Sequence, residues 1–297
     1  MNHSKADPYR QGVASITSDY IPLAQSTRSG QTILQFPTSQ VYFLRTSARL
    51  INGRILPNRT MAALQLENSA LQINGWKKDG PCLVIGHGGA KFKAVETEAA
   101  FYGGILFNQE ITDRGWPETS DICAVLAITK ESEAKLRRLF KAAAKSFLTN
   151  PTAQTEKQTE ELEHSILSAI DEAVRGSSNR ETNRIARQRR YFNLVEQIDN
   201  HLLAHIGEPV YSSEFAQSLG VSVRAVAAAV NQYRGMSLHK YVRLKRLWLT
   251  RQALLDGNGS IKTCAMKRGF WHMGEFTRIY RAQFNETPSQ TLQNRPS

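Results

Sequence analysis

The sequence predicts an α+β protein in which a mostly β N-terminal part is followed by an all-helical C-terminal part. Three observations lead to this prediction. Short apolar runs separated by turn residues fill the stretch between residues 32 and 107. Two copies of an Ala-x3-Gly pattern lie in the last third of the 297 residues. The charge also changes along the chain, since residues 180–297 carry 18 Lys and Arg against 8 Asp and Glu, whereas residues 1–179 carry 20 against 18.

Residues 1–30 are polar and rich in Ser, Thr and Gln, and we expect a loose lead-in there. From Thr32 onward the apolar runs are short, and turn-forming pairs such as Asn52-Gly53 and Asn74-Gly75 break them. The runs are Ile33–Phe36, Val41–Leu44, Leu50–Ile55, Met61–Leu66, Leu71–Ile73, Cys82–Ile85 and Phe101–Phe107. Short strands with closely spaced turns predict an antiparallel sandwich or barrel.

Two amphipathic helices are expected after the strands, at about 132–147 and 160–174, and they complete a domain of residues 31–175. The apolar stripe of the second helix consists of Leu162, Ile166, Ala169, Ile170 and Ala173. This stripe either packs onto the β part of the same chain or pairs with its copy in a second chain. Residues 176–190, rich in Ser, Asn and Arg, form the expected linker to a helical domain of residues 191–297.

The C-terminal part holds two helix-turn-helix patterns joined by one long helix. The first contains Ala216, Gly220 and Ser222, and the second contains Ala265-x3-Gly269 followed by Phe270-Trp271-His272. In each, the small alanine lets two helices cross closely and the glycine occupies the turn. Ser222 is a good N-cap for the helix that follows. Two copies about fifty residues apart are a strong signal, because a repeat rarely arises by chance.

The helix after each turn has an expected buried stripe and an outward face. The buried stripes are Val226, Val230 and Tyr233 in the first helix and Phe276, Tyr280 and Phe284 in the second. The connecting helix, from Ser237 to Leu255, carries cations that we expect to contact phosphates or to face solvent. These are Arg243, Lys245, Arg246 and Arg251. A rigid connector would hold the two helices about 34 Å apart, which is one turn of DNA.

Further residues extend the pattern of the two motifs over roughly the last third of the chain. They are Leu219-Gly220-Val221-Ser222, Arg224, Gly235-Met236-Ser237, Tyr241-Val242, Lys245-Arg246-Leu247, Tyr280-Arg281 and Pro288-Ser289. Together with the motifs they resemble the DNA-binding domain of the AraC/XylS family of bacterial transcription regulators. Val230 departs from the family, which usually has Phe there. The resemblance implies a sequence-specific transcription regulator, commonly an activator, with a cupin-like sensory domain at its N-terminus.

The resemblance also implies partners and contact residues. The partners would be double-stranded DNA, a second copy of the chain, RNA polymerase and a small-molecule effector. In the first helix the resemblance places Arg224, Ala227 and Ala228 toward the major groove. The remaining DNA-contacting residues are expected because they lie away from the buried stripes or at the helix start, and they are Asn231, His272, Met273, Gly274, Thr277, Arg278 and Arg281. Arg224 and Arg278 have the length and the donors to bind a guanine edge. His272 would cap its helix or contact a phosphate.

Arg45 and Arg49 form an Arg-x3-Arg pair that resembles the phosphate-binding motif of cyclic-di-nucleotide receptors. Two guanidiniums could bind two phosphates bidentately. The same spacing recurs at Arg180 and Arg184, so composition alone can produce it. The pair therefore defines an alternative, in which the regulator responds to a cyclic di-nucleotide.

No metal site and no cofactor are expected, because a cupin metal centre needs several histidines and residues 30–130 contain His87 alone. An enzyme with an attached DNA-binding domain is a rival prediction, but no Gly-x-Ser-x-Gly, His-Glu-x2-His or Cys-x2-Cys motif supports it. A DNA-packing protein without sequence preference is another. The cysteines are odd in number and scattered, and no run approaches the roughly 18 apolar residues of a membrane span. We therefore expect a cytoplasmic protein.

Overall fold

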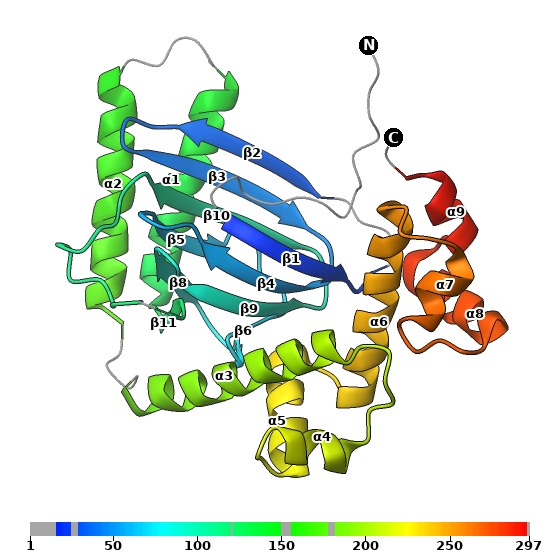
Figure 1. Ribbon diagram of the computed structural model, residues 1–297. Helices are drawn as coiled ribbons and strands as arrows, with labels where there is room; N and C mark the ends of the chain where they lie inside the picture. The colour runs from blue at the N-terminus through cyan, green and yellow to red at the C-terminus, as the bar shows by residue number, and fades with distance from the viewer. Residues whose placement is uncertain (1–15, 25–28, 120, 150–155, 178–181, 296–297) are drawn as a thin grey trace.

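The computed structural model describes residues 16–24, 29–119, 121–149, 156–177 and 182–295. Its N-terminal part contains two antiparallel sheets, a five-stranded sheet in the order β1-β4-β9-β6-β7 and a six-stranded sheet in the order β11-β8-β5-β10-β3-β2 (Figure 1). The strands are β1 Ile16–Pro22, β2 Gly30–Gln35, β3 Ser39–Thr46, β4 Arg49–Ile55, β5 Thr60–Gln65, β6 Leu71–Ile73, β7 Trp76–Lys77, β8 Cys82–His87, β9 Lys91–Glu96, β10 Ala100–Phe107 and β11 Ala124–Ala127. Of the sandwich and the barrel that the short apolar runs predict, this part is the sandwich. The loose lead-in expected at residues 1–30 is wrong for Ile16–Pro22, which form β1 and pair with β4.

The inner faces of the two sheets pack against each other. Ile51 of β4 and Ala94 of β9 belong to the same buried cluster as Met61 of β5 and Leu106 of β10. Burial of these alternate positions follows from the pleat, because successive side chains of a strand point to opposite faces. The predicted turn at Asn74-Gly75 joins β6 to β7 with positive φ at both residues, as two-residue hairpin turns require.

Helices α1, Lys130–Thr149, and α2, Glu156–Arg175, cover the outer face of the six-stranded sheet (Figure 1). The apolar stripe of α2 faces the sheet. Ile166 and Ala173 are fully buried there in one cluster with residues of α1 and the strands. Of the two expectations for this stripe, the structure therefore supports packing within the chain.

The C-terminal part is entirely helical over its described residues. Its helices are α3 Thr182–Ala204, α4 Ser212–Ser218, α5 Val223–Arg234, α6 Leu238–Leu255, α7 Ile261–Met266, α8 Met273–Phe284 and α9 Pro288–Gln293. Helix α3 begins well before Tyr191, so residues 182–190 of the expected linker are helical instead. Residues 178–181 of that linker lie outside the described part. The run of strands followed by a run of helices confirms the α+β fold class.

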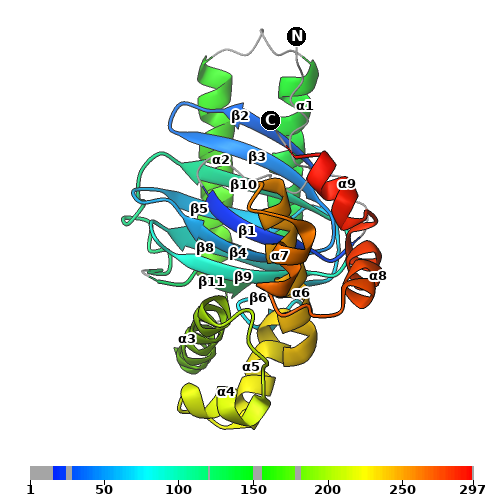
Figure 2. The same ribbon diagram turned by 45° about the vertical axis from the view of Figure 1, so that its right-hand side comes forward.

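The helical part has one core for each motif, and α6 contributes to both. The first core joins α3, α4, α5 and α6, and it includes Ile21, Leu50 and Val95 from the five-stranded sheet. The second core joins α6, α7 and α8 through residues such as Leu247 and Tyr280. Both views place α4 and α5 at one end of α6 and α7 and α8 at the other (Figure 1 and Figure 2). The first motif therefore rests on the β part.

Candidate nucleic-acid interface

The first helix-turn-helix consists of α4, the turn at Gly220 and α5. Gly220 has φ +64°, which glycine adopts without strain. Ser222 is the N-cap of α5, and its hydroxyl accepts a 3.1 Å hydrogen bond from the backbone N–H of Ala225. The expected stripe of Val226, Val230 and Tyr233 is buried, which confirms that prediction. The burial of one face fixes which face of α5 remains outward.

The outward face of α5 carries the residues expected to contact DNA. Arg224, Ala227, Ala228 and Asn231 are all exposed. Arg224 lies in the first turn of the helix, and the two alanines lie one turn further on. Arg224 is the only one of the four with a long cationic side chain, so it has the reach to bind a base edge while the alanines can offer apolar contact.

The second helix-turn-helix consists of α7, the turn at Gly269 and α8. Gly269 has φ +80°, and a Cβ there would lie 2.9 Å from the carbonyl oxygen of Gly207, so both the conformation and the space demand glycine. Phe276, Tyr280 and Phe284 are buried, as predicted. His272 takes the N-cap position of α8, but its side chain makes no capping hydrogen bond. Of the two roles expected for His272, the structure does not support side-chain capping.

The outward face of α8 holds the second set of named residues. His272, Gly274, Thr277, Arg278 and Arg281 are exposed, and Met273 is half-buried. Arg278 is bound bidentately by Glu275 of the same helix, with Nε–Oε2 at 2.9 Å and Nη2–Oε1 at 2.7 Å.

Hydrogen bonds within α8 determine which groups of this face are available to DNA. The hydrogen bonds from Arg278 lower the pKa of Glu275, so the carboxylate stays charged beside the guanidinium. The hydroxyl of Thr277 donates to the backbone oxygen of Met273, which leaves the threonine methyl as the freer end of that side chain.

Helix α6 differs from its expected charge distribution. Lys245 and Arg251 were expected to contact phosphates or solvent, but they are only 7% and 3% exposed. Lys245 binds Asp199 of α3, and Arg251 binds Glu286 at 3.0 Å. Arg243 is exposed, as predicted from the sequence. Arg246 is half-buried and donates to the backbone oxygens of Ile206, at 2.8 Å, and of Glu208. Three of the four cations named from the sequence therefore have partners within the fold, as a buried charge requires.

Asp199 is the centre of a buried cluster of charges between the sheet and the first motif. Its carboxylate lies 3.0 Å from Lys93 Nζ of β9 and also binds Arg234 of α5 and Tyr241 of α6. Burial alone would raise the pKa of Asp199, but the charges of Arg234, Lys245 and Lys93 outweigh burial and hold that pKa well below its usual range. The cluster therefore exists with the carboxylate ionised.

The last turn of α5 is also tied directly to the β part. Arg234 Nη2 donates to Asn52 Oδ1 of β4 at 2.8 Å. Gln232 Nε2 donates to the backbone oxygen of Gly75 at 3.1 Å, and the amide of Gln72 donates to the backbone oxygen of Gln232. Tyr233 packs so closely on Gly75 that a Cβ there would lie 2.6 Å from its ring. The end of the first recognition helix is thus fixed against β4 and the β6–β7 hairpin.

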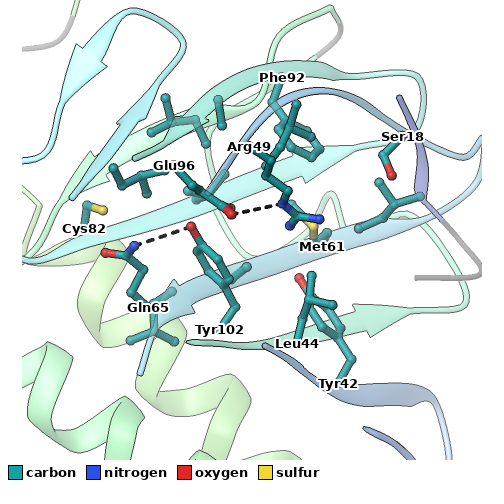
Figure 3. A pocket seen from close by; sticks show the side chains of 18 residues that line it. Ser18, Tyr42, Leu44, Arg49, Met61, Gln65, Cys82, Phe92, Glu96 and Tyr102 are labelled. Carbon is teal, nitrogen blue, oxygen red and sulfur yellow. Dashed lines mark hydrogen bonds and ion pairs between the residues drawn. The ribbon is translucent and has the colours of Figure 1, made fainter. Parts of the chain in front are cut away.

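The interior of the sandwich contains a cavity of about 100 Å³. Most of its lining is apolar, and among the polar side chains Glu96 lies between Gln65 and Arg49, with Ser18 beyond Arg49 (Figure 3). Arg49 Nε binds Glu96 Oε2 at 3.0 Å, and Gln65 lies 3.4 Å from the hydroxyl of Tyr102. Burial, helped by Glu96, raises the pKa of Tyr102, so its hydroxyl keeps its proton. The cavity can accept a small molecule with an apolar body and one polar end.

Two of the strands that line this cavity, β4 and β9, also hold the first motif. In β4, Arg49 and Ile51 line the cavity. Asn52, the next residue after Ile51, faces the other side of the sheet and contacts Arg234. In β9, Ala94 lines the cavity while Lys93 faces Asp199. Because successive side chains of a strand alternate between the faces of a sheet, a single layer of backbone separates the cavity from α5.

The structure does not bring Arg45 and Arg49 together. Arg45, on β3, is exposed, pairs with Glu67 at 3.4 Å and lies over the ring of Phe101. Arg49 lines the cavity and is paired with Glu96. Each guanidinium is paired with its own carboxylate, one at the surface and one inside the sandwich. The arrangement therefore does not favour binding of the two phosphates of a cyclic di-nucleotide by both arginines.

Sequence patterns indicated no role for Asp199 or Lys93. They predicted a turn at Asn52-Gly53, which was wrong, because both residues lie inside β4. One signal was present for Asp199, which follows Val195 by one helical turn and so shares its buried face. An acidic residue on an apolar stripe indicates a buried ion pair, although it does not identify the partners. Nothing local marks Asn52, whose partner lies 182 residues away in the chain.

No helix of the described residues is long and apolar enough to cross a membrane. The same described residues contain no group of three or more His, Cys, Asp and Glu side chains that could hold a metal ion.

His201 and His205, on α3, pack against each other with their ring centroids 4.6 Å apart.

Comparison with known proteins places one family model on the chain, a helix-turn-helix domain that matches residues 215–294. A XylDLEGF operon transcriptional activator of Pseudomonas putida is 26% identical over 103 residues, which are 34% of this chain and 31% of that protein. The virulence regulon transcriptional activator VirF of Yersinia enterocolitica is 33% identical over 78 residues, 26% of this chain and 29% of that protein. The match thus spans about a third of the length of each of these two relatives.

Solved structures match either about a third of the chain or most of it. A probable AraC family transcriptional regulator from Rhodopseudomonas palustris is 30% identical, with 35% of this chain and 99% of that chain covered and a TM-score of 0.32. The AraC-like transcriptional activator CuxR covers 85% of this chain and 91% of its own, at 14% identity and a TM-score of 0.42.

Proposed function

The C-terminal third of this chain is a helix-turn-helix domain of the AraC/XylS family, and from that premise we propose that the protein is a sequence-specific, DNA-binding transcription regulator. We assign DNA binding to residues 191–297 and the sensing of a signal to residues 31–175. The two activators among these relatives favour activation over repression. In this proposal the regulator acts in the cytoplasm on double-stranded DNA.

One observation supports DNA binding above the others. Both recognition helices bury their apolar stripes, and both leave the opposite faces open at the same time. Arg224 and Arg278 lie on those open faces, at opposite ends of α6. A connecting helix with a motif at each end can present two recognition helices to successive major grooves on one side of a duplex.

The experiment that tests this proposal is a selection of binding sites from a random duplex pool with the full chain. Enrichment of one sequence, followed by competition with bulk DNA, is the expected result. Equal binding to the selected site and to bulk DNA would instead identify a DNA-packing protein. A reporter gene placed behind the selected site then separates activation from repression.

We further infer that the cavity between the sheets is the effector site and that its walls carry the signal to α5. This inference is supported by strands β4 and β9. Their inward residues line the cavity, and their outward residues bind Arg234 and Asp199. A ligand that displaces the backbone of these strands by a fraction of an ångström changes the position of the first recognition helix, α5, on the sheet. The polar end of the ligand would meet Arg49 and Glu96.

Thermal-shift screening of the full chain against small metabolites with an apolar body and one polar end tests the effector site. A ligand that raises Tm and also changes affinity for the selected DNA supports it. A ligand that raises Tm equally in a variant with a filled cavity would be bound elsewhere, which contradicts the assignment. Cyclic di-nucleotides belong in the same screen as the alternative class.

Homodimerisation and contact with RNA polymerase are part of the proposal and rest on the family resemblance. The stripe of α2 is occupied within the chain, since Ile166 is fully buried against α1 and the sheet. A charge at Ile166 would therefore unfold the domain and would not report on assembly. Sedimentation of the unmodified chain over a range of concentrations is the appropriate measurement.

A further inference from the structure

Exposed large apolar side chains are concentrated in the two helix-turn-helix motifs. Among the described residues, those with high exposure are Leu203 at 50%, Tyr211 at 59%, Val223 at 45% and Trp271 at 63%. Tyr211 precedes α4, Val223 begins α5 and Trp271 lies in the turn before α8. Scattered exposed apolar residues are ordinary, but the exposure of an indole beside a recognition helix is not accounted for by the fold.

The turn before α8 is built so that Trp271 points away from the core. Phe270, its neighbour, packs on Phe276 with ring centroids 5.0 Å apart and belongs to the second core. His272, on its other side, is the N-cap of α8. In the first motif the N-cap Ser222 follows the turn glycine by two residues, whereas His272 follows Gly269 by three. The longer turn therefore leaves room for one residue outside the core, and that residue is Trp271.

Trp271 lies next to the outward face of α8. It comes two residues before Met273, the first residue of that helix, and so lies near the N-terminal end of the helix whose exposed face carries Thr277 and Arg278. The N-terminal end of a recognition helix is the end that enters the major groove and contacts base edges. A side chain just outside that end meets the wall of the groove, which is formed by deoxyribose and the edges of the flanking bases.

We propose that Trp271 is a DNA-contacting residue whose indole packs against a deoxyribose and the neighbouring base edge, beside the bases that Arg278 reaches. The inference rests on the proposed function, since it requires that α8 binds DNA. The indole gives a large apolar contact with few rotatable bonds, and its N–H can donate to a phosphate oxygen. Contact with a thymine methyl would add a preference for thymine at the position flanking the bases read by α8.

The first measurement uses the unmodified chain and needs no substitution. Trp116 is buried and Trp76 and Trp248 are partly buried, so Trp271 is the tryptophan most open to a soluble quencher such as acrylamide. Addition of the selected duplex is expected to remove the quenchable fraction of the fluorescence. The same titration with Trp271→Phe identifies that fraction as the signal of Trp271.

The second measurement is affinity for the selected duplex. Trp271→Ala is expected to weaken binding about tenfold, which corresponds to about 1.4 kcal/mol. Leu203→Ala is the matched control, because Leu203 is an exposed apolar residue on α3, outside both recognition helices, and its removal is expected to leave affinity unchanged.

Each outcome decides between the inference and its premise. If the unmodified chain selects no DNA, both the proposed function and this contact are wrong. If the chain selects a site but Trp271 stays quenchable in the complex and Trp271→Ala binds normally, the contact alone is wrong. Shielding of Trp271 by rising protein concentration in the absence of DNA would point to self-association and would also overturn it.

Discussion

Arg234, in the last turn of the first recognition helix, donates a 2.8 Å hydrogen bond to Asn52 on the strand that lines the cavity. The guanidinium is 1% exposed, and its Nε and Nη1 have no hydrogen-bond partner among the described atoms. It lies over the ring of Tyr241 at 5.1 Å, which compensates part of the desolvation. The position of α5 therefore depends on a small number of contacts that the sheet provides.

Replacement of Asn52 should loosen α5 without unfolding the protein. Asn52→Ala removes two charge-assisted hydrogen bonds, one from Arg234 and one from Lys93 Nζ at 3.2 Å, while both cations keep their ion pairs with Asp199. We expect a loss of about 1.5–3 kcal/mol in the free energy of unfolding. Faster hydrogen exchange in the last turn of α5 and a weaker effect of the effector on DNA affinity should accompany it.

A matched control exists on the far side of the sandwich. The amide oxygen of Asn68 accepts a 2.8 Å hydrogen bond from Arg137 at the surface, so Asn68→Ala removes the same kind of bond far from α5. It should leave hydrogen exchange in α5 unchanged. If both variants change α5 equally, or neither does, the sheet does not hold the helix through Asn52.

Replacement of Asp199 should lower stability in a pH-dependent way. Asp199→Asn leaves Arg234, Lys245 and Lys93 without their common carboxylate, which should cost about 3–5 kcal/mol near pH 7. The pKa of Asp199 is depressed in the folded state, so its contribution is present above the unfolded value of about 3.9 and is lost as pH falls below it.

Urea unfolding at a series of pH values from neutral to about 3 measures this contribution. The difference between the unmodified chain and Asp199→Asn should shrink as the pH falls below about 4. Asp113→Asn, at an exposed position, is the control and should show no such difference. A gap between the two unfolding curves that stays constant with pH would show that the charge of Asp199 is not what stabilises the cluster.

The extent to which these features follow from the sequence depends on how local they are. The turn at Gly220, the cap at Ser222 and the buried stripe at Val226 were predictable, because residues within two helical turns determine them. The bond between Arg234 and Asn52 was not, since it joins residues 182 positions apart. A helix pattern shows that Arg234 lies in the last turn, but it does not show that a sheet will cover it.

The charged residues show the same limit. Arg243 and Lys245 are two residues apart on α6 and look equivalent in the sequence, yet one is exposed and the other buried. The difference arises from α3, which brings Asp199 against one face of α6 only. Arg45 and Arg49 similarly form a pair in the sequence, but they lie on different strands, and Arg45 is exposed whereas Arg49 is buried.

The buried pair of Arg49 and Glu96 should be necessary for the effector but not for the fold. In Arg49→Met/Glu96→Gln both charges are removed together, and a buried pair replaced by groups of similar volume is often neutral for stability. We expect little change in Tm and a loss of the stabilisation that the effector gives. Thermal shift with and without the effector is the measurement.

Arg45 and Glu67 offer the same chemistry at the surface. Arg45→Met/Glu67→Gln removes an exposed ion pair of the same residue types, and it should keep the full response to the effector. A response lost in this surface variant and kept in the cavity variant would move the effector site to the outside of the sheet, and it would revive the alternative at Arg45.

Arg278 should contribute sequence preference, and Glu275 should lower the affinity for DNA of any sequence. Arg278→Ala should cost about 1–3 kcal/mol at the selected site and little on random DNA, as expected for a base contact. Glu275→Gln removes an acidic group from a surface that approaches phosphates, so affinity for random DNA should rise. Binding assays on both duplexes measure the two effects. Equal losses on both duplexes for Arg278→Ala would identify a phosphate contact instead.

The salt dependence of DNA binding should distinguish the exposed cations from the buried ones. Each phosphate contact contributes about 0.9 to the slope of log affinity against log salt concentration. Arg243 is exposed on α6, so Arg243→Ala should reduce the slope by about 0.9 if it neutralises a phosphate. Lys245, two residues away, is 7% exposed and bound to Asp199, so Lys245→Met should leave the slope unchanged even where it lowers stability.

The slope separates these two effects because a loss of folded protein shifts the apparent affinity at every salt concentration alike, whereas a lost phosphate contact changes how affinity varies with salt. The titrations use the selected duplex and a fixed temperature below the Tm of both variants. A reduced slope for Lys245→Met would mean that the buried cluster opens when DNA binds. Asp199 would then be released from Lys245, and the position of α5 on the sheet would differ between the free protein and its complex with DNA.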